Sequence, residues 1–188
     1  MTIQKILIPV MILVVVAVGI FSAVSFGRQD QKVTIQSNAS FAKVTKDELI
    51  QNSDALAIVT VENIKSFEDV SDIRPGKQDV FSDVTVVVNE YLYNPQKLTD
   101  SELVLRVLGG ETEDTKMIVN GGASFEEGEQ AAVFLKRKDD QVFEVVGWAQ
   151  GKYTIKEDSI GQGQEKVFMK DIFGKEMTLD DFRSEFTE

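Results

Sequence analysis

Residues 121–153 constrain the fold more than any other stretch, because they combine two strand patterns with several glycine-rich turns. Residues 130–135 and 141–148 are predicted strands, and the charged residues 136–140 between them have the length of a hairpin connection. Turns at Asn120-Gly121 and at 148–151 bracket the pair. We expect this segment to form the closing half of a small β-barrel.

The remaining chain supplies further short strands that end at turn signals. Two short helices are also predicted, since Thr45 and Glu48, and again Thr178 and Asp181, stand at helix-capping spacings. Residues 65–79 contain Pro-Gly and many charges and are predicted to be a loop. The other strands are predicted at 54–64, 81–93, 101–108, 117–119, 152–155 and 166–169.

These elements predict a mainly β chain: a small antiparallel β-barrel with short flanking helices. The barrel domain is assigned to residues 45–188. Residues 28–44 are polar and small, and they are predicted to be a linker with at most a short strand at 33–35.

Residues 6–26 form an apolar run that is long enough to cross about 30 Å of hydrocarbon as a helix. A cleaved signal peptide usually has a shorter apolar core, so residues 1–27 are predicted to be an uncleaved signal anchor. Small residues leave open cleavage after Ser25 or Gly27, which would release a secreted protein. We expect a single-pass protein of the cytoplasmic membrane with its domain on the extracytoplasmic side.

The chain carries 20 basic and 31 acidic residues, a net charge of −11. Lys5 is the only charged residue before Arg28, so residues 28–188 carry −12. This charge repels nucleic acid, and no nucleic-acid partner is expected. Its simplest interpretation is the solubility of an extracellular domain.

The sequence contains no cysteine and no histidine. Zinc sites of the usual kind, haem, iron–sulfur clusters, disulfides and the Ser-His-Asp and Cys-His mechanisms all need one of these residues. No cofactor is therefore expected, and the chain is predicted not to be an enzyme.

Several stretches between residues 49 and 155 carry a resemblance: SDALAIVTV, VLGG, FEEGE and GWAQGKY. They resemble a class of uncharacterised exported bacterial and archaeal proteins with FxxGE and GxxQGKY motifs. That class is distantly similar to TIMP and netrin-like domains, which are five-stranded barrels of the oligonucleotide/oligosaccharide-binding (OB) type. The resemblance implies the fold alone, because TIMP inhibition depends on an amino-terminal cysteine that this chain lacks.

Three residues of the 121–153 segment are candidate ligand contacts: Glu129, Trp148 and Gln150. Glu129 could offer an acceptor beside Gly128, and an aromatic such as Trp148 can stack a ligand on a barrel face. The alternative is architectural, with glycines at tight corners, Glu129 capping exposed amides, and Trp148 as a core or rim aromatic.

The sequence thus predicts a membrane-anchored, non-enzymatic module that binds an envelope protein or glycan. Two other classes stay open. One is an inhibitor of a protease or another enzyme. The other is a calcium-responsive surface domain, because acidic clusters such as 111–114 and 126–129 could bind calcium weakly. No metal site is assigned, since none of the clusters has EF-hand spacing and solvated loop charge explains them.

Overall fold

The computed structural model of the chain describes residues 32–38, 42–71, 74–160 and 164–186. The chain divides into two units, Met1–Lys32 and Val33–Glu188, and the second holds all the elements given below. The predicted anchor at 6–26 lies outside the described residues. Among the helices that the structure does describe, none is long and apolar enough to cross a membrane.

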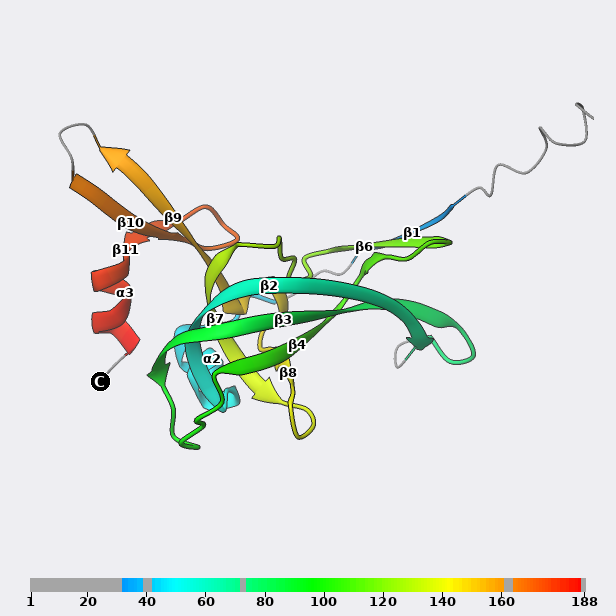
Figure 1. Cartoon of the computed structure of the whole chain (residues 1–188), viewed down its shortest axis with the longest axis horizontal. Coiled ribbons are helices and arrows are strands. Elements are labelled where there is room, and N and C mark those ends of the chain that lie inside the picture. Colours follow the sequence, from blue (N-terminus) through cyan, green and yellow to red (C-terminus); the bar gives the residue numbers. More distant parts are fainter. Residues whose placement is uncertain (1–31, 39–41, 72–73, 161–163, 187–188) are drawn as a thin grey trace, which may run out of the picture. The chain divides into compact units, whose positions relative to one another are not determined.

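The described chain is mainly β, as predicted (Figure 1). Its elements, in chain order, are β1 (Val33–Asn38), α2 (Lys46–Asn52), β2 (Ala55–Val70), β3 (Gln78–Tyr93), β4 (Glu102–Leu108), β5 (Gly110–Glu111), β6 (Thr115–Asn120), β7 (Gln130–Arg137), β8 (Val142–Val145), the 3-10 helix η1 (Trp148–Gly151), β9 (Lys152–Ile160), β10 (Gln164–Lys170), β11 (Glu176–Thr178) and α3 (Leu179–Phe186).

Five strands close into a barrel in the order β7, β2, β3, β4, β8, because β8 also pairs back with β7. All of these pairs are antiparallel except β4 with β8, which is parallel. Register shifts in the β2–β3 pair, such as the one between Val61 and Asn63, increase the local twist that closure requires. Beyond the barrel, β9, β10 and β11 extend the sheet from β7.

The barrel interior is filled by small and medium apolar side chains from alternate positions of its strands. Ala55, Ala57 and Val59 of β2 point inward, as do Val133 of β7 and Phe143 of β8. The core therefore confirms the predicted barrel-like, mainly β class.

The two helices pack on the outside of the barrel. Phe182 and Phe186 of α3 lie with Leu49 of α2 and Phe134 of β7 in a second apolar cluster. The ring centroids of Phe134 and Phe186 are 5.3 Å apart in an edge-to-face arrangement. The first half of β2, residues 55–61, is therefore buried on both faces, as its apolar sequence predicted.

The capping predictions are confirmed. Thr45 and Glu48 form a reciprocal capping box at the start of α2. At the start of α3, Thr178 Oγ1 accepts a hydrogen bond from the Asp181 amide at 3.1 Å. These bonds satisfy amide groups that a first helical turn leaves without intrahelical partners.

The prediction of a loop at 65–79 is wrong for most of its length. Residues 65–70 and 78–79 belong to β2 and β3, which continue beyond the barrel as a long hairpin. There the strands have no interior to face, so charged residues replace the apolar alternation that signals a strand. The rings of Phe67 and Phe81 stack across this hairpin with centroids 6.1 Å apart.

Strand β1 is longer than the short strand predicted within the linker. It pairs in parallel with β6 along all six of its residues, from Val33 opposite Thr115 to Asn38 opposite Asn120. With β5 these strands form a separate three-stranded sheet. Several of the predicted linker residues thus belong to an ordered sheet.

Candidate functional site

The structure does not bring the three predicted site residues together. Trp148 lines a groove on the barrel surface, Gln150 is buried, and Glu129 lines a different cavity of about 410 Å³. The three side chains therefore have different environments.

Gln150 holds the segment that leads into α2. Its side-chain oxygen accepts a hydrogen bond from the Val44 amide at 2.9 Å, and its side-chain nitrogen donates to the Ala42 carbonyl at 3.0 Å. Both ends of the buried amide are therefore satisfied from within the chain. This side chain serves the architecture of the domain.

Glu129 forms a largely buried ion pair with Lys152, its Oε1 lying 2.6 Å from the lysine Nζ. The same oxygen accepts a hydrogen bond from Thr154 Oγ1 at 2.9 Å, and Oε2 accepts one from the Glu126 amide at 3.1 Å. The amide contact is the turn cap that the architectural alternative predicted. Phe125 packs partly buried against the barrel core beside it.

Trp148 occupies the left-handed region of the backbone, with φ of 59°. This conformation costs a residue other than glycine roughly 1–2 kcal/mol. It follows from the tight corner before β9, where a Cβ on Gly151 would lie 1.8 Å from the Val146 carbonyl oxygen. The corner places the partly exposed indole at the barrel surface, away from the interior core.

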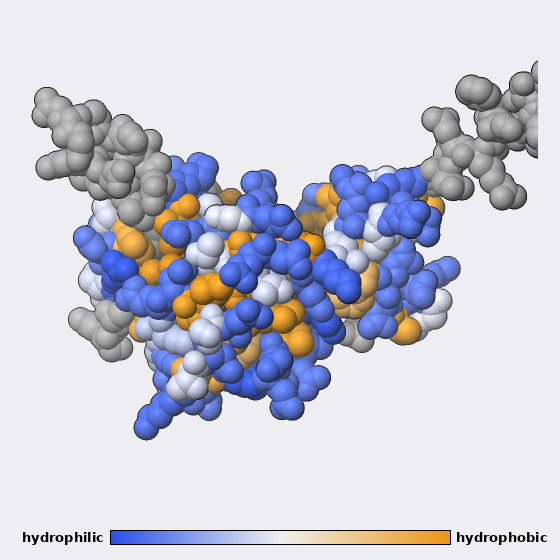
Figure 2. Space-filling view, in the orientation of Figure 1, coloured by the Kyte–Doolittle hydropathy of each residue, from blue (hydrophilic) through white to orange (hydrophobic). Residues whose placement is uncertain are grey.

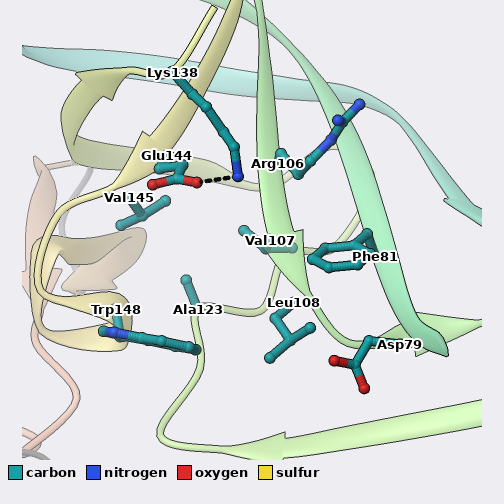
Figure 3. Close-up of a pocket in the computed structure, with 10 residues that line it drawn as sticks. All are labelled: Asp79, Phe81, Arg106, Val107, Leu108, Ala123, Lys138, Glu144, Val145 and Trp148. Carbon is teal, nitrogen blue, oxygen red and sulfur yellow. Dashed lines mark ion pairs between the residues drawn. The ribbon is translucent and has the colours of Figure 1, made fainter. Parts of the chain in front are cut away.

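The indole forms one wall of a cavity of about 250 Å³, which we call the Trp148 groove (Figure 3). Strand β4 supplies the opposite wall, and β8 and the residues after it supply the rim on the indole side. The groove is lined by Asp79, Phe81, Arg106, Val107, Leu108, Ala123, Lys138, Glu144, Val145 and Trp148.

The charges at the groove are paired. Lys138 Nζ lies 2.7 Å from Glu144 Oε1 at the rim, as the dashed line in Figure 3 marks. The Arg106 guanidinium binds Asp83 through two hydrogen bonds of 2.7 Å. These hydrogen bonds raise the pKa of Arg106, so the guanidinium stays charged at any physiological pH. The buried Asp79 is paired with Arg74.

Aromatic and basic groups continue the groove along β3 and β2. The Arg106 guanidinium lies 4.9 Å from the centroid of the Phe67 ring, which stacks on Phe81. Phe67 and Phe81 are site neighbours that sequence reasoning missed, because a loop was predicted at 65–79 and the pairing of the two strands was not foreseen. The signal that could have found them is that each lies seven residues from Arg74, beside Pro75-Gly76 in the connection between the strands. The face of the molecule in Figure 2 carries apolar patches interrupted by charged side chains.

The described residues contain no group of three or more acidic side chains arranged to hold a metal ion. In the 126–129 cluster, Glu129 is already bonded to Lys152 and to the Glu126 amide. The Glu129 carboxylate is therefore already bonded to other groups of the chain.

Fold and groove define a small, mainly β protein with a closed five-stranded sheet and a shallow surface groove at Trp148. No protein-family model matches the sequence, and no curated protein matches it either.

Proposed function

We propose that this chain is a non-enzymatic extracytoplasmic binding module, held at the cytoplasmic membrane by residues 6–26. Its ligand is an envelope protein or glycan, and its binding site is the Trp148 groove. We further propose that the barrel is of the OB type and related to TIMP-like domains.

The strand order supports the OB assignment. If β2, β3, β4, β7 and β8 are numbered one to five, they pair in the order 4-1-2-3-5, which is a five-stranded Greek-key barrel. The first three strands form a meander, and the fifth returns beside the third in parallel. OB-type barrels bind ligands on the face of their second and third strands, which here are β3 and β4.

The backbone of Trp148 is the single observation that carries the proposed site. A non-glycine residue at a φ of 59° is costly, and such residues are concentrated at ligand-binding sites and active sites. This costly backbone conformation places a large amphipathic ring on the wall of a mostly apolar cavity. Tryptophan is also enriched among the residues that dominate binding energy in interfaces.

The carboxylates of the groove support a binding role over catalysis. Asp79 is paired with Arg74, and Glu144 is paired with Lys138. Each of these carboxylates already has a cation of the chain as its partner, whereas a general acid or base must reach the proton that it transfers.

The length of the 6–26 run supports the anchor, since 21 predominantly apolar residues suffice to span a bilayer. Cleavage after Ser25 or Gly27 would instead give a secreted form with the same groove. Mass spectrometry of the chain from membrane and medium fractions distinguishes the two forms.

Chemical crosslinking in intact cells, with the full chain as bait, tests the function. The wild type is compared with Ala123→Leu, which fills the groove from a residue on its wall. We expect an envelope component that crosslinks to the wild type and not to this variant, at equal expression and melting temperature. Turnover of a substrate that stops on replacing Asp79 or Glu144 would contradict the proposal.

A further inference from the structure

The outer edge of β4 faces the Trp148 groove, so a ligand in the groove can reach the backbone of this strand. The Gly109 amide donates a hydrogen bond to the Val80 carbonyl at 2.7 Å. In an antiparallel ladder this bond makes Leu108 and Phe81 a non-hydrogen-bonded pair. The N–H and C=O of Leu108 therefore point away from β3, toward the groove.

The hydrogen bond of Val104 agrees with this alternation. Val104 lies four residues before Leu108, and its amide donates to the Gln141 carbonyl at 3.3 Å, on the side of β8. Because strand residues alternate, Val104, Arg106 and Leu108 all direct their backbone groups to the same edge.

Strand β8 accompanies this edge for only part of its length. Its ladder with β4 consists of Val104 opposite Val142 and Leu105 opposite Phe143. The following residues of β8 pair with β7, including Val145 with Leu135. The two strands diverge there, and the Trp148 groove occupies the space between them (Figure 3).

The groove also continues lengthwise. Val107, Leu108 and Ala123 line both the Trp148 groove and a neighbouring cavity of about 630 Å³, which reaches Met117 and Val119 of β6. The two cavities therefore share a wall at the end of β4. The Trp148 cavity alone, at about 250 Å³, lies below the ~300–1,000 Å³ that encloses a drug-sized ligand. It therefore suits one side chain of a longer molecule.

We infer that the ligand is an extended polypeptide segment that adds to β4 as a strand at Leu108 and inserts an apolar side chain against Trp148. An exposed strand edge offers a row of donors and acceptors that another strand complements, and pockets beside it select alternate side chains. The paired rim charges favour an apolar side chain, because they leave little net charge to attract an ionic one.

This inference rests on the proposed function and is narrower than it. A glycan could stack on Trp148 without using the β4 edge. Only a peptide strand would accept a hydrogen bond from the Leu108 amide. Protection of this amide against hydrogen exchange therefore distinguishes a peptide ligand from a glycan.

The full chain is reconstituted in lipid nanodiscs and used to select from displayed decapeptides. These have Val, Ile, Leu or Phe at alternate positions and Ser or Thr between them. We expect the selected peptides to shift the emission of Trp148, the single tryptophan, and to slow hydrogen exchange at the Leu108 amide. Methylating the peptide nitrogens that face β4 should weaken binding at least about tenfold, the equivalent of one or two hydrogen bonds.

Leu108→Pro provides the matched protein variant. It removes the amide that faces the groove and spares the Gly109 bond to Val80. We expect at least about a tenfold loss of peptide affinity. If this variant does not fold, the methylated peptides give the same information on the wild type.

N-acetylglucosamine oligomers are the glycan probe. If they shift Trp148 emission without slowing exchange at Leu108, while no peptide is selected, strand addition is wrong and the binding function stands. If peptides bind without slowed exchange at Leu108, strand addition is equally wrong. If crosslinking to envelope components proceeds unchanged in Ala123→Leu, the groove itself is not the site and both proposals fail.

Discussion

Gln150 and Trp148 lie two residues apart in one turn of 3-10 helix, yet their environments are opposite. Gln150 is buried, and both of its polar atoms bond within the chain. Trp148 is partly exposed beside a groove, on a backbone conformation that costs energy. A buried side chain that braces its own chain stabilises the fold, whereas a partly exposed side chain on a cavity wall can also contact a ligand. The variants below test this distinction.

Gly151→Ala should have the largest effect on stability. Its Cβ would lie 1.8 Å from the Val146 carbonyl oxygen, so the corner must deform. We expect a loss of about 3 kcal/mol, which lowers Tm by roughly 6–12 °C in a domain of this size. Thermal unfolding followed by circular dichroism measures it.

Gly128→Ala is the matched control for that variant. Gly128 has a φ of 80°, and a Cβ there meets nothing within 4 Å. The cost should be only the backbone term, about 1–2 kcal/mol. Equal losses at the two positions would contradict the account of the corner.

Gln150→Ala should cost about 2 kcal/mol, because it leaves the Val44 amide and the Ala42 carbonyl without their partner. Partner capture should persist at temperatures where the variant is folded. A variant of unchanged Tm that no longer captures the partner would make Gln150 a ligand contact and reverse its assignment.

Trp148→Gly should change stability by no more than about 1 kcal/mol, since glycine adopts the left-handed backbone freely and offsets the packing that is lost. Binding should fall at least about 30-fold, as expected for a dominant interface tryptophan. Denaturant titration and a binding assay on the same sample check both values. Retained binding would remove Trp148 from the site.

The smallest predicted effect is on the pH dependence of stability, and it comes from Asp54. Burial acts to raise the pKa of Asp54, but hydrogen bonds from the Arg137 amide and from Lys136, with the charge of Lys136, outweigh it and lower the pKa. A lowered folded-state pKa contributes stability at higher pH, and this contribution is lost as pH falls below about 4. Asp54→Asn should therefore flatten the acid side of the stability curve.

The ion pair between Lys138 and Glu144 at the groove provides the comparison for Asp54. Glu144 is about half exposed, so Glu144→Gln should lower stability at neutral pH less than Asp54→Asn does. A larger change from Glu144→Gln than from Asp54→Asn would contradict the view that Asp54 stabilises the fold and Glu144 belongs to the groove.

The sequence was sufficient for the mainly β class, because its apolar stretches, such as those of β2 and β7, are short and lie between turn signals. It was also sufficient for both helix starts, since a capping box is a local bond between residues three apart. It failed at 65–79, where strands leave the barrel and lose the apolar alternation that marks burial.

The site was less accessible to sequence reasoning. Glu129, Trp148 and Gln150 share one segment, and only the fold separates their environments. The groove itself depends on the divergence of β8 from β4 after two residue pairs, a long-range event that no local pattern encodes. Phe81 and Arg106 enter the site for the same reason.

The most direct test of the central claim uses the single tryptophan as its own reporter. The emission of Trp148 and its quenching by acrylamide are measured on the full chain while the partner captured from cells is titrated. The account predicts an emission shift and reduced quenching that saturate with binding measured independently. Unchanged emission and quenching at full occupancy would contradict the assignment of the Trp148 groove as the binding site.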